Sequence, residues 1–166
     1  VYGVSKQVAE NLIRISGIPF TILRLSNVYG PGCRPNYNSV VATMCYRAAR
    51  GLPLVINGDG RQGRDFIYVD DVVRAFVLAG FESMSGAEKI FNVSSGKMVS
   101  IKQIVKQVCR LHKNTKVEFL TDKKNVEISY CCDPSKFFGK YSWRPRVSLS
   151  KGIEQALSYY RGRKIT

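Results

Sequence analysis

Apolar residues recur at helical spacing through the first sixteen positions of the chain. They form a single stripe made of Val4, Val8, Leu12 and Ile15. This period predicts an amphipathic helix over about residues 2–16, and Gly17 supplies a stop at its C-terminal end. The next segment, residues 20–25, is mostly apolar and rich in β-formers. It predicts a buried parallel strand with helices on both sides.

Short apolar runs, turn residues and helical patterns continue along the rest of the chain. Further strands are predicted at 53–57, 66–69, 90–93, 117–120 and 127–131. One helix is predicted at 39–50, and others begin near Asp70, Ser100, Asp133 and Ser150. A Gly/Pro-rich loop at 29–35 follows the strand at 20–25, and such loops form ligand sites in open α/β sheets. The alternation of strands and helices predicts the α/β class.

Tyr2 and Lys6 stand four residues apart at the start of the first predicted helix. Side chains at this spacing share one helix face, so the Lys6 ammonium can lie close to the Tyr2 phenol. A neighbouring cation favours the ionised form of a phenol, and such a pair can do acid/base chemistry. The same spacing also occurs on exposed helix faces without a function, so other residues must decide between the two interpretations.

The chain is strongly basic. It has 26 Lys and Arg against 12 Asp and Glu, which gives a formal net charge of +14. This excess favours an anionic partner. The basic residues are scattered along the sequence instead of forming one run or one helix face. The scatter favours a phosphate-bearing small molecule over nucleic acid.

Cysteine, histidine and long apolar segments give no sign of a metal or a membrane. The five cysteines and the single histidine lack metal-site spacing, so no metal is expected. An odd number of cysteines without metal-site spacing is typical of reduced cysteines buried in a protein core, which favours a cytoplasmic protein. No apolar stretch of the sequence is long enough to span a membrane.

Four stretches follow the Tyr2/Lys6 pair in a fixed order. They are Arg-Leu-Ser-Asn-Val-Tyr-Gly-Pro-Gly at 24–32, the glycine-rich turn and strand at 58–71, Phe-Asn-Val-Ser-Ser-Gly-Lys at 91–97, and Asp-Pro-Ser-Lys at 133–136. Together with the pair, these motifs resemble the extended short-chain dehydrogenase/reductase family of NAD-dependent nucleotide-sugar epimerases and dehydratases. The resemblance runs from residue 1 to about residue 160.

The resemblance implies an α/β fold in two parts. Residues 1–32 would hold the catalytic helix and the last part of an incomplete, Rossmann-type dinucleotide-binding domain. Residues 33–166 would form mainly a small mixed α/β substrate-binding domain, with about 66–93 returning to the Rossmann sheet. No glycine-rich dinucleotide turn precedes Tyr2, and the first residue is Val. We therefore expect the C-terminal part of a longer, homodimeric protein, inactive and prone to self-association when alone.

The resemblance also assigns roles around the cofactor. Tyr2 matches the tyrosine that acts as general acid or base for a sugar hydroxyl. Lys6 matches the lysine that binds the nicotinamide ribose and helps to keep the tyrosine ionised. Leu25 and Val28 match positions whose backbone lies beside the nicotinamide. The implied cofactor is NAD, with NADP left open.

The implied substrate is a nucleotide-diphosphate sugar. Arg64 matches the family's diphosphate arginine, with an ion pair to Asp65, Asp70 or Asp71 as the alternative. Lys123 stands where a second basic group is expected, as a point charge instead of an arginine fork. Asn27 matches a substrate contact, with an Asx-turn as the alternative. Asn57 replaces an aromatic that stacks on the nucleobase in several relatives, which leaves the base open.

Two classes of function remain open from the sequence. The first is an NAD-dependent epimerase or dehydratase that uses Tyr/Lys acid/base chemistry with transient hydride transfer at a sugar carbon. The second is a non-catalytic module that binds the phosphate of a nucleotide sugar or of nucleic acid. Epimerases, dehydratases, decarboxylases and reductases of nucleotide sugars are not separated by these residues.

Overall fold

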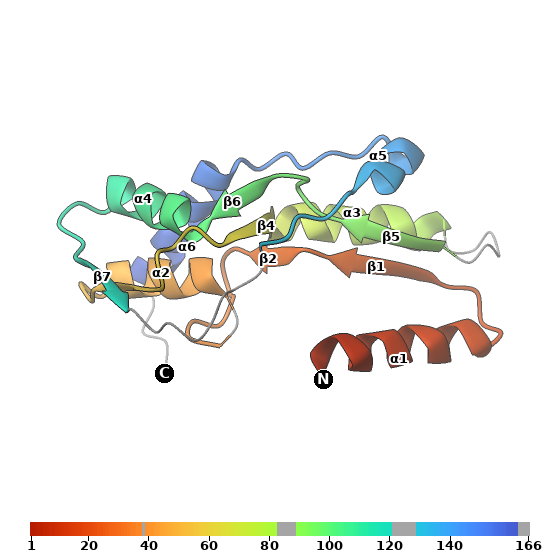
Figure 1. The fold of residues 1–166 in the computed structure, drawn as a ribbon. Coiled ribbons are helices and arrows are strands. Elements are labelled where there is room, and N and C mark those ends of the chain that lie inside the picture. Colours follow the sequence, from red (N-terminus) through yellow and green to blue (C-terminus); the bar gives the residue numbers. More distant parts are fainter. Residues whose placement is uncertain (38, 83–88, 121–128, 163–166) are drawn as a thin grey trace.

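The computed structural model describes residues 1–37, 39–82, 89–120 and 129–162 (Figure 1). Helices occupy α1 (Tyr2–Ile15), α2 (Val40–Ala49), α3 (Val69–Glu82), α4 (Ile101–Leu111), α5 (Ser135–Tyr141) and α6 (Leu149–Arg161). Strands occupy β1 (Thr21–Leu25), β2 (Asn27–Tyr29), β3 (Leu54–Asn57), β4 (Gly63–Tyr68), β5 (Lys89–Val93), β6 (Met98–Ser100) and β7 (Val117–Leu120). The α/β class predicted from the sequence is confirmed.

The described strands pair in three small sheets that are mostly parallel. β1 pairs with β5 in parallel, with Leu23 opposite Phe91. β2 pairs with β4 in parallel, and β4 pairs with β6 in antiparallel orientation. β3 and β7 form the third, parallel pair. Because β1 and β2 are almost continuous in sequence, the first two sheets follow each other along the molecule (Figure 1).

Two hydrophobic clusters hold these elements together. The larger lies among α2, α4, α6 and the strands β2, β3 and β4, with Val41, Ile56 and Ile153 almost fully buried. The smaller joins α3, β5 and α5, where Phe91 and Trp143 each pack edge-on against Phe137. Figure 1 shows the same division, with α2, α4 and α6 at one end of the molecule and α3 and α5 at the other. The domain boundary suggested by the sequence remains a prediction.

The ends of several elements differ from those expected. Ser100 caps α4 as predicted, in a capping box with Gln103. The last helix is capped by Ser148, whose Oγ accepts from the Lys151 amide, so the prediction of Ser150 was wrong. Asp70 lies in the first turn of α3, because that helix already begins at Val69. The N-cap preference for Asp and Ser does not distinguish between two such residues that lie within two positions of a helix start. These caps were misplaced for that reason.

Two short strands were not predicted, and the described part of the strand expected at 127–131 and the start of α5 also differ from the prediction. β2 and β6 span only three residues each, too few to show a period, and both form by pairing with β4. The strand expected at 127–131 falls partly outside the described residues, and 129–131 are not in a strand. α5 begins at Ser135, two residues after Asp133, whose carboxylate accepts a hydrogen bond from the Ser135 amide at 2.9 Å.

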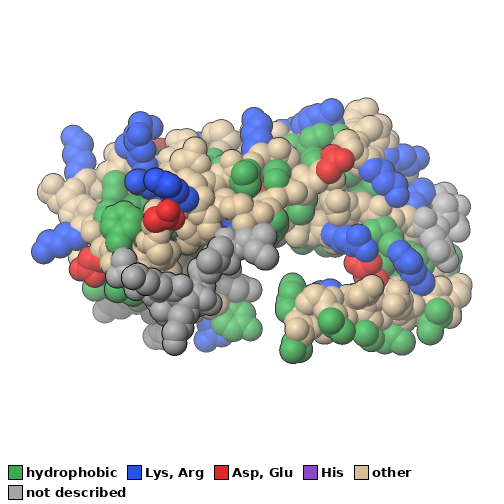
Figure 2. Space-filling model, viewed as in Figure 1, with side chains coloured by type: hydrophobic (Ala, Val, Ile, Leu, Met, Phe, Trp, Pro, Cys, Tyr) green, Lys and Arg blue, Asp and Glu red, His purple; other side chains and the backbone are tan. Residues whose placement is uncertain are grey.

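Helix α1 stands apart from the rest of the chain. None of its residues is buried, and the predicted apolar stripe is exposed, with exposed fractions from 51% at Val8 to 80% at Ile15. Figure 2 shows hydrophobic side chains along this helix and open space between it and the body of the molecule. The residues of β1 are half-buried or exposed. The sequence therefore predicted the parallel pairing of β1 correctly but not its burial.

Gly152 allows α6 to pack directly on Tyr29. A Cβ atom at position 152 would lie 2.7 Å from Cε2 and 2.8 Å from Cζ of Tyr29, which is 2% exposed. We expect Gly152→Ala to lower the free energy of unfolding by about 1–3 kcal/mol, because a buried ring must move. Gly80→Ala in α3 is the matched control: its Cβ meets nothing within 4 Å. It should raise stability by roughly 0.5–1 kcal/mol. Urea unfolding of both variants checks this, and equal effects would contradict the packing argument.

Candidate active site

A cavity of about 1110 Å³ opens beside the strands β2 and β4. Its walls come from the first residue of α1, from β1 and β2, from α2, and from β3 and β4. It is lined by six of the eight residues selected from the sequence, namely Tyr2, Leu25, Asn27, Val28, Asn57 and Arg64. Residues that lie up to 62 positions apart in sequence therefore face one space.

Tyr2 and Lys6 lie together on α1, as their spacing predicts. The Lys6 ammonium is 5.5 Å from the centre of the Tyr2 ring, over its face. The Tyr2 side chain is 77% exposed and lines the cavity. A ligand in the cavity can therefore reach the Tyr2 phenol, which lies at the rim and is not covered by other side chains.

The sequence suggested that Asn27 lies in a loop at the end of a strand, where an Asx-turn can form, but Asn27 belongs to strand β2. Its Nδ2 donates hydrogen bonds to the Asp65 carbonyl and to the Tyr130 hydroxyl, both at 3.0 Å. Both amide hydrogens are therefore used within the chain. The oxygen Oδ1 lies 3.4 Å from the Tyr130 hydroxyl, and its second lone pair can accept from a donor such as a sugar hydroxyl but not from a phosphate oxygen.

Arg64 is half-buried in β4, where its Nη1 donates to the Gly63 carbonyl at 2.9 Å. Its guanidinium carbon lies 4.8 Å from the centre of the Tyr130 ring. The alternative partner Asp65 is buried, and its carboxylate accepts hydrogen bonds from the amides of Ser95 and Gly96 at 2.9 and 3.0 Å. The Asp65 carboxylate therefore holds the loop after β5 in place.

Asp71, another alternative partner of Arg64, is also occupied. Its carboxylate is 1% exposed, and Arg74 donates to it at 2.5 Å. It accepts further hydrogen bonds from the backbone amides of Arg146 and Val147, at 2.9 and 3.1 Å. Asp71 therefore ties α3 to the segment that precedes α6.

Of the two remaining residues expected to bind substrate, the structure describes Asn57 but not Lys123. Asn57 is exposed at the end of β3, and its backbone carbonyl accepts a hydrogen bond from Nε2 of Gln62 at 3.0 Å. Lys123 lies outside the described residues. Sequence reasoning missed Tyr37, Gln62 and Tyr130, which line the same cavity. A signal for Tyr130 was not available, because it lies 66 positions from Arg64.

Two further side chains of the cavity limit the chemistry of its wall. Burial raises the pKa of the Cys33 thiol, which keeps it neutral and a poor nucleophile at neutral pH. Ser26 is 8% exposed, and among the described residues its Oγ has no hydrogen-bond partner. An orphaned buried hydroxyl at a cavity wall can serve a bound molecule, because leaving it unpaired costs free energy.

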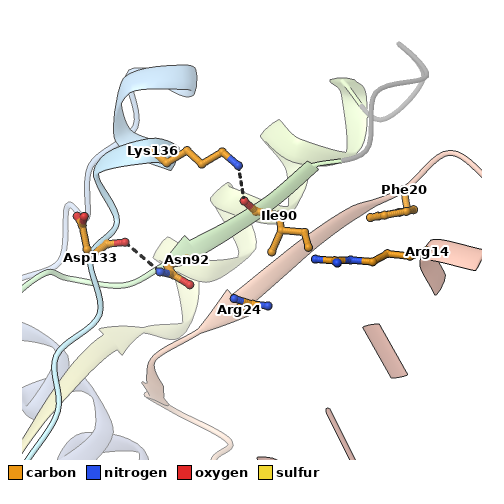
Figure 3. A pocket seen from close by; sticks show the side chains of 7 residues that line it. All are labelled: Arg14, Phe20, Arg24, Ile90, Asn92, Asp133 and Lys136. Atoms are coloured by element: carbon orange, nitrogen blue, oxygen red, sulfur yellow. Dashed lines mark hydrogen bonds between the residues drawn. The ribbon is translucent and has the colours of Figure 1, made fainter. Parts of the chain in front are cut away.

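A second cavity, of about 530 Å³, lies between α1, β1, β5 and α5 (Figure 3). Arg14, Arg24 and Lys136 face it, but two of these cations have partners. Arg24 forms a bidentate pair with Glu10 at 2.6 and 2.8 Å. Lys136 donates to the Ile90 carbonyl at 3.0 Å. The sequence-selected residues do not line this cavity.

The charged surface and the titratable clusters give no second candidate. On the face drawn in Figure 2, Lys and Arg side chains are spread over many elements and form no single patch. Within residues 1–37, 39–82, 89–120 and 129–162, no group of three or more His, Cys, Asp or Glu side chains could hold a metal ion. Nor is any helix of these ranges both long and apolar enough to cross a bilayer.

Comparison with known sequences connects the chain to one family. The profile described as the NAD dependent epimerase/dehydratase family matches residues 1–94. A dTDP-glucose 4,6-dehydratase of Haemophilus influenzae is 26% identical, over 96% of this chain and 51% of its own. A putative UDP-glucose 4-epimerase of Methanocaldococcus jannaschii is 29% identical, over 99% of this chain and 54% of its own. The chain thus spans about half the length of the curated relatives it matches.

Solved structures give the same result for the fold. The UDP-glucose 4-epimerase of Thermotoga maritima, solved with UDP-glucose, superposes with a TM-score of 0.82 at 33% identity. That match covers 96% of this chain and 51% of the other. The UDP-glucuronic acid 4-epimerase of Bacillus cereus, solved with UDP-glucuronic acid and NAD, gives a TM-score of 0.85 at 31% identity. It covers 97% of this chain and 52% of the other.

Proposed function

The chain belongs to the NAD-dependent epimerase/dehydratase family, and we propose from this premise that it forms part of a nucleotide-sugar epimerase or dehydratase. The observation that carries the proposal is the cavity of about 1110 Å³ lined by Tyr2, Asn27 and Arg64. Tyr2 offers an acid/base group, Asn27 a hydrogen-bond acceptor and Arg64 a cation, which suit the hydroxyls and the phosphates of a sugar diphosphate. In this proposal the chain alone does not catalyse turnover.

Tyr2 exchanges a proton with a hydroxyl of the sugar. As a phenolate it accepts the proton, and as a phenol it returns the proton in the reverse step. Lys6 holds its ammonium over the face of the ring, 5.5 Å from the ring centre. The position of Tyr2 at the cavity rim allows this exchange without a rearrangement of the buried core.

The residues around Tyr2 also fit the cofactor of the family. Lys6 would bind the nicotinamide ribose, and the backbone of Leu25 and Val28 would lie beside the nicotinamide ring. The orphaned Oγ of Ser26 lies in the same cavity wall, between these two positions, and favours a bound polar partner there. NAD, when bound, supplies a hydride acceptor and donor for a sugar carbon.

Arg64 binds the diphosphate in this proposal. Its guanidinium emerges from β4, a strand paired on both sides, and it is only half-buried. A planar fork on a rigid strand suits two phosphate oxygens. Oδ1 of Asn27 then accepts a hydrogen bond from the sugar, because the Asn27 amide hydrogens are already used.

A non-catalytic module that binds nucleic acid is the competing function. The net charge of +14 is the observation in its favour. A nucleic-acid site would need cations gathered on one face, whereas the visible Lys and Arg side chains are dispersed (Figure 2). The two functions differ in their salt dependence, because release of many counterions makes nucleic-acid binding fall steeply with salt.

Titration of the chain with UDP-glucose, dTDP-glucose and a single-stranded oligonucleotide at two salt concentrations tests the proposal. We expect one of the two nucleotide sugars to bind with a modest loss of affinity at the higher salt, because one diphosphate meets few cations. The oligonucleotide should bind weakly. Tight oligonucleotide binding with a steep salt dependence, and no binding of either nucleotide sugar, would reject the proposal in favour of the module.

A further inference from the structure

Tyr130 joins two candidate substrate residues that come from different strands. Its hydroxyl accepts a hydrogen bond from Nδ2 of Asn27 at 3.0 Å. The face of its ring meets the Arg64 guanidinium, whose carbon lies 4.8 Å from the ring centre. All three side chains line the large cavity. One tyrosine therefore contacts both the acceptor proposed for the sugar and the cation proposed for the diphosphate.

The backbone at Tyr130 is fixed against β4. The Gly63 amide donates to Oγ of Ser129 at 2.8 Å, and the Tyr130 amide donates to the Gly63 carbonyl at 3.3 Å. One residue further on, Sγ of Cys131 lies 3.5 Å from Oδ2 of the buried Asp65. Three consecutive residues are thus attached to the strand that carries Arg64. The Tyr130 ring starts from a backbone whose position is set by the same strand.

We propose that Tyr130 is a positioning residue that sets the orientation of Arg64 and Asn27 before the substrate binds. The inference rests on the proposed function, in which Arg64 binds the diphosphate. A guanidinium is attracted to the face of an aromatic ring, and a free arginine has many rotamers. Contact with the ring therefore reduces the rotamer freedom that Arg64 loses on binding a diphosphate. The hydroxyl lies 3.0 Å from Nδ2 and 3.4 Å from Oδ1 of Asn27 and so fixes the plane of that amide.

The ring and the hydroxyl of Tyr130 have separable roles. Tyr130→Phe removes the hydrogen bond to Asn27 and keeps the ring face for Arg64. Tyr130→Leu removes both. Tyr37→Leu is the control, because Tyr37 lines the same cavity and is in contact with another arginine, Arg34, at 5.9 Å. If Tyr130 served only the fold, Tyr130→Phe and Tyr130→Leu would give the same signal from the Arg64 side chain in the absence of a ligand.

Nuclear magnetic resonance of the arginine side chains reads the arrangement without a ligand. The ring current of Tyr130 should shift the Nε–H resonance of Arg64, since the guanidinium carbon lies 4.8 Å from the ring centre, and the loss of this resonance in Arg64→Ala assigns it. We expect this resonance to move towards the free-arginine position in Tyr130→Leu and to stay in place in Tyr130→Phe and Tyr37→Leu. An unchanged resonance in Tyr130→Leu would overturn the inference while leaving the proposed function untouched.

Binding of UDP and dTDP by the variants tests the consequence of this arrangement. Tyr130→Leu should raise the dissociation constant of the nucleotide that binds by roughly 2- to 5-fold, the range of exposed cation–π contacts. Tyr130→Phe should match the wild type. The Arg64→Ala/Tyr130→Leu double variant should bind no more weakly than Arg64→Ala alone, because Tyr130 acts through Arg64. Additive losses in the double variant overturn the positioning role. No loss in Arg64→Ala rejects the diphosphate role and, with it, the inference.

Discussion

Tyr2→Phe is expected to lower kcat by about 10²-fold or more, which is the low end of the contribution of a positioned general acid or base. The measurement needs a protein that carries both this chain and a glycine-rich dinucleotide-binding segment, with UDP-glucose and dTDP-glucose as substrates. The substitution keeps the ring under the Lys6 ammonium and removes only the ionisable hydroxyl. Because Tyr2 is 77% exposed, the free energy of unfolding should hardly change.

Tyr37→Phe is the matched control for this loss. Tyr37 is 75% exposed and lines the same cavity, but it is not on α1 and has no lysine four residues later. Its substitution should leave kcat within about 3-fold of the wild type, since general acid/base catalysis is confined to the positioned group. Near-normal turnover in Tyr2→Phe, or equal losses in the two variants, would remove Tyr2 from the mechanism.

Arg64→Ala should weaken nucleotide-sugar binding by on the order of 2 kcal/mol, or roughly 30-fold in the dissociation constant. The loss is large because Arg64 is half-buried, and a charge-assisted contact in a sheltered site is little screened by solvent. Calorimetric titration of the chain with UDP-glucose and dTDP-glucose measures it directly. A substantial loss should persist when the salt concentration is raised.

Arg61 provides the control for the charge alone. It lies three residues before Arg64, its side chain is 86% exposed, and it pairs with Asp59 at 3.4 Å at the surface. Arg61→Ala removes the same formal charge from the same segment and should change the affinity by less than about 2-fold. If both variants lose affinity equally and the loss disappears with salt, Arg64 acts only through the general field of the protein.

Local pattern predicted much of the fold correctly. The helical stripe of α1, the apolar run of β1 and the cap at Ser100 each lie within one short window of sequence, where period and capping chemistry are decisive. Failures arose where a neighbour decides the outcome. β2 exists because Asn27 to Tyr29 pair with Phe66 to Tyr68, and three residues alone carry no period.

The candidate site shows the same division. The spacing of Tyr2 and Lys6 marked them as candidates, and the resemblance to the family marked Arg64. Tyr130 could not, because its role depends on contacts with β2 and β4 that form only in the folded chain. The direction of Asn27 was also hidden, since its amide hydrogens are taken by the Asp65 carbonyl and the Tyr130 hydroxyl.

The detached position of α1 has a thermodynamic consequence for any partner that covers it. Its link to β1 includes the Arg24–Glu10 pair, which lowers the pKa of Glu10 mainly through a hydrogen bond. That contribution to stability is present above the ordinary pKa of glutamate and is lost as the pH falls through the lowered pKa of Glu10.

The exposed apolar stripe from Val4 to Ile15 has a second consequence. When a partner covers this stripe, the association should show a negative heat-capacity change set by the apolar area removed from water. The affinity of a partner for α1, which carries Tyr2, would then change more with temperature than the affinity of Arg64 for a phosphate.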